Sequence, residues 1–131
     1  MKQQAREIAL QILFQAEFTS PISITEFRDL FEEKADKESL NFADTLIVGV
    51  QKHKEELDKL IQSKSAHWNI SRMSFVDRNI LRMALFEMKF ADHPNKPSIV
   101  INEAVNIAKK YGTTDSSAFV NGVLDSLAKE L

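Results

Sequence analysis

Apolar residues recur at steps of three and four along nearly the whole chain, and alternation with a period of two is almost absent. A three-to-four step places side chains on one face of an α-helix, so the pattern predicts an all-α fold. The first such stripe predicts a helix that ends before Pro21. Its members are Ala5, Ile8, Ala9, Ile12, Leu13 and Ala16.

The longest stripe predicts one helix over residues ~40–63, interrupted at most mildly by Gly49. It consists of Phe42, Ala43, Leu46, Ile47, Val50, His53, Leu57, Leu60 and Ile61. Before it, Ser23-Ile24-Thr25-Glu26 has the form of a capping box, in which a hydroxyl and a carboxylate each satisfy a free backbone N–H. A short helix is therefore expected to open at Ser23, and the charged run 32–38 is expected to be a solvated connection.

The second half of the chain contains recognisable helix boundaries. Ser74 is expected to cap a helix that prolines 94 and 97 terminate, because proline cannot donate a helical hydrogen bond. The apolar run 99–101 has no partner strand in the sequence and is interpreted as a helix entry. Gly112 predicts a left-handed helix end, and Asp115 or Ser116 is expected to start the last helix.

That last helix has an apolar stripe made of Phe119, Val120, Val123, Leu124, Leu127, Ala128 and Leu131. Asn121, Gly122 and Asp125 lie together on the opposite side. A glycine inside a helix costs about 1 kcal/mol relative to alanine, so Gly122 predicts another element pressed against that side. Trp68, in the link between two helices, is expected to pack in the core.

The composition narrows the possible functions. A chain of 131 residues is expected to form one domain over 1–131. The absence of cysteine excludes disulfides and thiolate metal sites and fits a cytoplasmic protein. No apolar run approaches the ~20 residues needed to span a bilayer. The net charge of −2 gives no general attraction to nucleic acid, so any such binding must be local.

Motifs of enzymatic chemistry are absent from the sequence. The three glycines lie far apart, so no phosphate-binding loop or dinucleotide fingerprint can form from adjacent glycines. The three histidines are also widely separated and suggest no metal site. We therefore expect a non-enzymatic interaction surface without cofactor or metal.

Two pairs of residues are candidates for that surface. Arg6 and Phe14 lie on one edge of the first helix, where they could bind a phosphate and stack a base; the alternative is a solvated arginine and a core phenylalanine. Arg78 and Arg82, one turn apart, could pair with Asp77 or with an RNA backbone. Asp115 has two compatible roles, as a helix cap and as a contact for a partner.

Four segments resemble the NusB family of bacterial transcription antitermination factors. They are residues 5–14 (AREIALQILF), 77–87 (DRNILRMALFE), 101–104 (INEA) and 119–125 (FVNGVLD). The last two are the most specific, and together the segments cover nearly the whole chain in order. The resemblance implies one all-helical domain of about six or seven helices in two packed bundles.

The resemblance also implies a function. A NusB-like protein pairs with the small-subunit ribosomal protein NusE, and together they hold boxA in single-stranded leader RNA. This assembly joins RNA polymerase and other Nus factors and promotes elongation through ribosomal RNA operons.

By position, the resemblance implies an RNA-binding set and a NusE-binding set. The first set comprises Lys2, Arg6, Phe14, Arg82, Asp115 and Phe119; the second comprises Asp77, Arg78 and Tyr111. Replacement of Arg6 or Arg82 by alanine is expected to weaken RNA binding without unfolding the domain. One departure is the N-terminal arm, which is rich in arginine in several relatives but reads Lys2-Gln3-Gln4 here. We therefore expect weak RNA binding without NusE.

Two alternatives remain open at this stage. NusB-like domains also occur fused to ribosomal RNA methyltransferases, so the chain could assist a separate methyltransferase. It could also be a homodimeric interaction module that buries its RNA edge.

Overall fold

The computed structural model describes residues 2–18, 31, 35–92 and 94–131, and this part of the chain is all-α, as predicted. Its five α-helices are α1 (Lys2–Ala16), α3 (Lys37–Lys64), α4 (Phe75–Leu85), α5 (Pro97–Tyr111) and α6 (Ser116–Ala128). A 3-10 turn, η1 (Ile70–Arg72), precedes α4, and a π-helical turn, η2 (Phe86–Phe90), follows it. The short helix expected from Ser23 lies outside the described residues.

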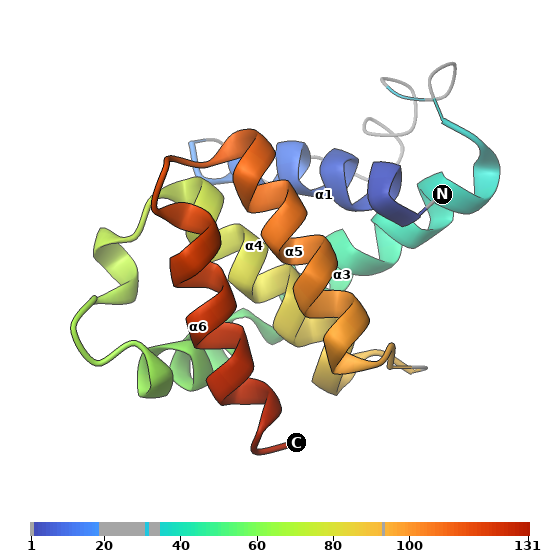
Figure 1. The fold of residues 1–131 in the computed structure, drawn as a ribbon. Coiled ribbons are helices and arrows are strands. Elements are labelled where there is room, and N and C mark those ends of the chain that lie inside the picture. Colours follow the sequence, from blue (N-terminus) through green and yellow to red (C-terminus); the bar gives the residue numbers. More distant parts are fainter. Residues whose placement is uncertain (1, 19–30, 32–34, 93) are drawn as a thin grey trace.

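Helix α4 lies at the centre of the fold (Figure 1). It contacts α1 and α3 on one side and α5 and α6 on the other. This arrangement agrees with the expected two packed groups of helices. The residues of α4 from Asn79 to Leu85 are all buried, as expected of a helix that is surrounded by four others. Among the described residues, no helix is long and apolar enough to cross a membrane.

Local capping sets the ends of two helices. Asp36 Oδ1 accepts a hydrogen bond of 2.7 Å from the backbone N–H of Ser39, so α3 begins a few residues earlier than the apolar stripe predicted. Ser74 Oγ accepts a bond of 3.0 Å from the N–H of Asp77, which confirms the predicted cap of α4. Pro97 occupies the first turn of α5, where its missing N–H has no helical partner to lose, and residues 99–101 are helical as expected.

Gly49 allows close contact between α3 and the segment after α4. A Cβ atom added to Gly49 would lie 2.2 Å from two ring atoms of Phe86, so only glycine leaves room for this ring. The sequence pattern predicts only a mild interruption of the helix at Gly49. Its role depends on which residue packs against it, which helical periodicity does not reveal.

The prediction for Gly122 was wrong. The apolar stripe of α6 packs inward through Val120, Val123 and Leu124. Gly122 is exposed, however, and within the described residues no atom lies within 4 Å of the position of its missing Cβ. No described element presses against this side of α6.

The predicted left-handed end at Gly112 was also wrong. Gly112 has φ −93° and ψ −169°, which is extended backbone open to any residue. Glycine is needed here for another reason, since an added Cβ would lie 2.4 Å from Ser116 Oγ. The Ser116 hydroxyl in turn accepts a hydrogen bond of 2.9 Å from the N–H of Thr113. Gly112 thus allows the chain to turn tightly into α6.

Candidate nucleic-acid and partner interface

Arg6 lies in the interior and is not a solvated arginine. Its side chain is bonded twice to Glu87 in η2, from Nε at 2.8 Å and from Nη2 at 2.7 Å, and only 4% of the residue is exposed. Asn95 donates a further bond of 3.1 Å to Glu87. The Arg6 guanidinium is therefore committed to a buried carboxylate, and its contact with RNA stays a prediction.

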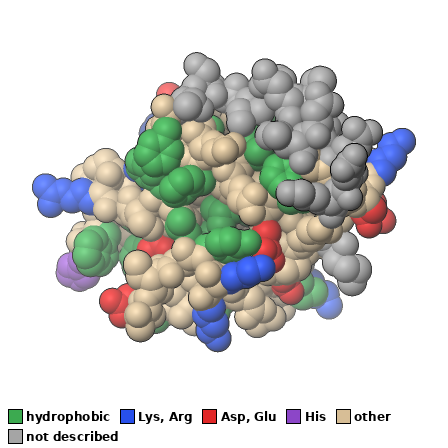
Figure 2. Space-filling view, turned by 90° about the horizontal axis from the view of Figure 1, so that it is seen from above, with side chains coloured by type: hydrophobic (Ala, Val, Ile, Leu, Met, Phe, Trp, Pro, Cys, Tyr) green, Lys and Arg blue, Asp and Glu red, His purple; other side chains and the backbone are tan. Residues whose placement is uncertain are grey.

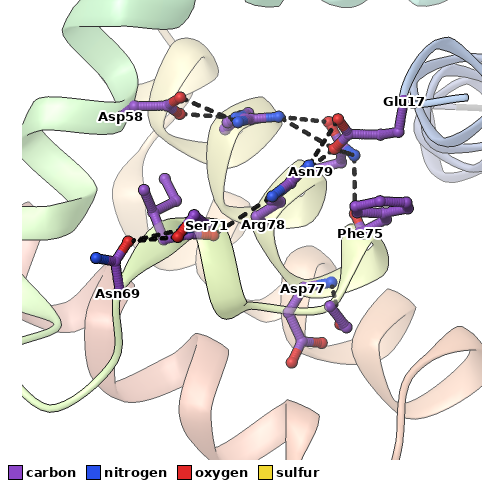
Figure 3. Close-up of polar contacts among 11 residues, drawn as sticks. Glu17, Asp58, Asn69, Ser71, Phe75, Asp77, Arg78 and Asn79 are labelled. Atoms are coloured by element: carbon purple, nitrogen blue, oxygen red, sulfur yellow. Dashed lines mark hydrogen bonds and ion pairs between the residues drawn. The ribbon is translucent and has the colours of Figure 1, made fainter.

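Arg78 and Arg82 are held by carboxylates from outside α4 (Figure 3). Arg78 donates two bonds, of 2.7 and 2.8 Å, to Glu17 just beyond α1. Arg82, only 5% exposed, donates bonds of 2.7 and 3.0 Å to Asp58 of α3. The predicted pairing of these arginines with Asp77 does not form. Both guanidinium groups instead join α4 to its neighbours.

Glu17 is the shared acceptor of this cluster. Asn79 also donates to it at 3.0 Å, and Arg82 Nη1 lies 3.4 Å away. Burial acts to raise the pKa of Glu17, but the hydrogen bonds and charges of the arginines outweigh it and lower the pKa below its ordinary value. The sequence analysis did not identify Glu17. Its partners lie more than 60 positions away along the chain, and no local pattern links such distant residues.

Three aromatic rings meet at the surface beside this cluster. Phe14, Phe18 and Phe75 have ring centroids 5.0 to 6.1 Å apart. Phe14 is 36% exposed and Phe18 is 65% exposed, so Phe14 is not the core residue that the alternative interpretation required. A cavity of about 400 Å³ adjoins Phe14, and we call it the Phe14 cavity. It is lined by Leu10, Gln11, Phe14, Gln15, Val76 and Tyr111.

Tyr111 lines the Phe14 cavity and is fixed by a carboxylate of α1. Its hydroxyl donates a bond of 2.5 Å to Glu7, and Lys110 donates another of 2.7 Å to the same oxygen. The bond to Glu7 raises the pKa of the Tyr111 hydroxyl above its ordinary value. These contacts join the end of α5 to α1 and hold Tyr111 beside the aromatic surface.

Asp77, Asp115 and Phe119 come together at a second cavity, of about 390 Å³. We call it the Trp68 cavity. Trp68, Arg72, Met73, Ser74, Thr113 and Ser116 complete its lining. The last helix starts at Ser116 with Asp115 at its N-cap position, as expected. The side chain of Asp115 makes no capping hydrogen bond, however, so its expected role as a cap was wrong. Its carboxylate is exposed at the cavity instead.

Trp68 is a surface residue, which corrects the expectation of core packing. It is 57% exposed, and its ring meets Phe119 edge-on with centroids 6.5 Å apart. The apolar stripe of α6 thus ends at an aromatic pair that is open to solvent. Sequence reasoning missed Trp68 and Arg72 as site residues, because the link before α4 has too little periodicity to predict which side chains face outward.

Lys2 is separate from both cavities. It is exposed at the start of α1, where Nζ donates a bond of 3.3 Å to Asn95 and lies 5.1 Å from the centre of the Phe42 ring. The nine predicted residues therefore fall into different environments: arginines tied to carboxylates, two surface cavities, and one terminal lysine.

The face over α1 and the end of α5 has a mixed surface (Figure 2). Hydrophobic side chains gather over its middle, with Lys, Arg, Asp and Glu side chains spaced around them. In this view, the described residues form no continuous basic patch. Such a surface suits a partner that offers apolar groups or bases as well as phosphates.

The sequence and fold match known proteins over nearly their whole length. The model of the NusB family matches residues 3–129. The transcription antitermination protein NusB of Bdellovibrio bacteriovorus is 54% identical over 128 residues, covering 98% of this chain and 95% of that protein. Its counterpart in Myxococcus xanthus is 41% identical over 136 residues, with 99% and 96% covered.

Solved structures give the same result. The NusB structure from T. maritima superposes with a TM-score of 0.89 at 35% identity, covering 99% of this chain and 92% of that one. A chain from the crystal structure of the antitermination factors NusB and NusE in complex with dsRNA gives a TM-score of 0.84 at 30% identity, with 98% and 96% covered. Because the sequence, the family model and the fold agree, this chain belongs to the NusB family.

Proposed function

We propose that the chain is a transcription antitermination factor and not an enzyme. It binds boxA leader RNA together with NusE and, through RNA polymerase and other Nus factors, promotes elongation through ribosomal RNA operons. The observation that carries this proposal is the family match over residues 3–129. The similarity to a chain solved with NusE and RNA adds support. These partners work in the cytoplasm, and we propose the same location for this chain.

We further propose that the two cavities bind different partners. The Phe14 cavity, with its aromatic surface and Tyr111, would receive NusE, because its lining is mostly apolar. This proposal differs from the assignment by resemblance, because it moves Phe14 to the NusE-binding set and Asp77, which lines the other cavity, to the RNA-binding set. The Trp68 cavity, with Phe119 and Asp115, would receive RNA, because it combines aromatic rings with polar side chains. Arg6, Arg78 and Arg82 would act by positioning the helices. Lys2 remains a candidate phosphate contact on the other side of α1.

A binding experiment tests the proposed function. Purified chain is titrated with boxA RNA and with a scrambled sequence of the same composition, each with and without NusE, and complexes are resolved by gel shift. We expect a complex with NusE alone and a ternary complex that prefers boxA. Failure to bind NusE, or equal retention of both RNAs in its presence, contradicts the proposal. Light scattering of the free chain identifies a homodimer, if one forms.

A further inference from the structure

The Trp68 cavity contains the features of a site for a single base. It lies where η1, the start of α4 and the start of α6 meet, and its volume is about 390 Å³. This volume is in the range of pockets that hold small ligands. The wall combines two aromatic side chains, one arginine and two carboxylates.

The aromatic part of the wall is open to a stacking partner. Trp68 is more than half exposed, and Phe119 touches it only edge-on, at 73° between the ring planes. One face of the indole is thus not covered by Phe119. Unpaired nucleobases stack on aromatic faces of this kind in proteins that bind single-stranded nucleic acid.

Asp77 provides the polar part. Its carboxylate points away from the Glu17 cluster on the other side of α4 (Figure 3). Its Oδ1 is buried and has no hydrogen-bond partner among the described residues. Buried polar groups are almost always paired in native structures. An ionised carboxylate only accepts hydrogen bonds, so the missing partner is a donor.

The charged side chains of the Trp68 cavity indicate which part of an RNA chain enters the cavity. Asp77 and Asp115 both line the cavity and repel a phosphate. Arg72 also lines it, is exposed, and can bind a phosphate outside. A base therefore fits the interior, and the backbone fits the rim.

We propose that the Trp68 cavity binds an unpaired guanine of the RNA, stacked on Trp68 and hydrogen-bonded to Asp77. The Watson–Crick edge of guanine has two adjacent donors, N1–H and the 2-amino group, which match the two oxygens of a carboxylate. Because Oδ1 is buried, the Asp77 side chain must turn to present both oxygens to the base. Adenine and cytosine have a donor next to an acceptor, and uracil has one donor between two acceptors. This inference rests on the proposed function, because it requires RNA binding. It adds a preference for one base and assigns Trp68, Arg72 and Asp77 to the site that recognises this base.

The proposal is directly testable by tryptophan fluorescence, because Trp68 is the only tryptophan of this chain. Emission of the Trp68→Phe variant in the same complex is subtracted, so that the difference reports on Trp68. The complex of the chain with NusE is titrated with uridine decamers that carry guanine, adenine, cytosine or uracil at one central position. We expect the guanine decamer to quench Trp68 emission and to bind about tenfold more tightly than the others, the ratio that corresponds to 1.4 kcal/mol. Replacing guanine by inosine, which lacks the 2-amino group, is expected to remove part of this preference.

Two variants separate base recognition from general effects. Asp77→Asn is expected to fold normally, because Ser74 caps the backbone of residue 77 and not its side chain, and to abolish the preference for guanine. Trp68→Ala is expected to weaken binding of the guanine decamer about tenfold, measured by anisotropy of labelled RNA. Val48→Ala removes an exposed apolar side chain from α3 and serves as the matched control, with unchanged binding.

Three results overturn the proposal: equal binding of the four decamers, unchanged preference in Asp77→Asn, or Trp68 emission that responds to NusE but not to RNA. The last result identifies the cavity as a protein contact. Formation of the boxA complex with NusE is scored separately by gel shift. If that complex forms while Trp68 does not respond to RNA, the inference fails and the proposed function stands.

Discussion

Arg6 shows how burial changes the meaning of a charged residue. From its position near the N-terminus, it was expected to contact RNA, and Arg6→Ala was expected to leave the fold intact. In the structure its bonds to Glu87 join α1 to η2 inside the protein. Loss of the arginine would leave the Glu87 carboxylate buried without its counter-charge.

We therefore predict that Arg6→Ala lowers the free energy of unfolding by about 3–5 kcal/mol, the usual cost of removing one partner of a buried pair. Urea denaturation of the variant and of the native protein measures this difference in the free energy of unfolding. Lys129→Ala is the control, since Lys129 pairs with Asp125 on the exposed surface of α6 and its loss should change stability by less than about 0.5 kcal/mol. Equal stability of Arg6→Ala and the native protein would show that the pair is not needed for folding.

Glu17 is predicted to make stability depend on acid pH. Its pKa is lowered in the folded protein, so its contribution is fully present above the pKa of the unfolded state, near the ordinary value of 4.5, and is lost as pH falls through the lower folded value. At neutral pH, Glu17→Gln should cost about 1.5–3 kcal/mol, the range for hydrogen bonds to charged groups.

Denaturation of the native protein and Glu17→Gln across pH tests this. The difference between them should shrink as pH falls below 4.5. A constant difference from neutral pH into this acid range would rule out the titration of Glu17 as its cause.

At the scale of helices, two glycines in helix interiors should respond to alanine in opposite ways. Gly49→Ala places a methyl group into the Phe86 ring and should destabilise the protein by about 1–3 kcal/mol, as overpacking does. Gly122→Ala meets only open space and should stabilise it by up to about 1 kcal/mol through higher helix propensity. Thermal unfolding of the two variants gives the comparison, and a stabilising Gly49→Ala would show that Phe86 moves aside without cost.

The helices also differ in how far the sequence predicted them. The cap at Ser74 and most of the stripe of α6 were correct, because both depend on residues within a few positions of one another. The stripe was wrong at Leu131, which lies beyond the end of α6 and is 52% exposed. The role of Gly112 and the environment of Gly122 were wrong. Both depend on what approaches from elsewhere: the Ser116 side chain at Gly112, and no described residue at Gly122.

At the scale of the whole molecule, the placement of charge predicts weak RNA binding by the free chain. The net charge is −2, and Arg6, Arg78 and Arg82 are bound to carboxylates. Few lysine and arginine side chains therefore remain near the proposed RNA surface to displace the counterions of the RNA. With about two phosphate contacts on a single strand, the plot of log K against log salt should have a slope near −1.4.

Anisotropy titrations of boxA RNA at several salt concentrations measure this slope, with and without NusE. Arg72→Gln should flatten the slope by about 0.7 if Arg72 contacts one phosphate. Tight binding by the free chain at physiological salt, with a steep slope, would contradict the prediction.

The sequence predicted only part of the candidate site, because some of its features depend on contacts between residues that are far apart along the chain. Sequence resemblance placed Asp77 in the NusE-binding set and Asp115 and Phe119 in the RNA-binding set, whereas in the structure all three line one cavity. It did not identify Trp68, whose exposure depends on how the link before α4 lies against α6.

The sequence by itself determined the helical class, most helix positions and the family, because periodicity, caps and motifs are short-range properties of the chain. Only the tertiary structure decided which arginines are neutralised and which aromatic rings are exposed. It also decided which glycine is crowded. Partners such as Glu87 for Arg6 and Glu17 for Arg78 lie 81 and 61 residues apart, and folding alone brings them within hydrogen-bond distance. Once paired, these charges hold helices together, and the surface over α1 and the end of α5 keeps a mixture of apolar and charged side chains.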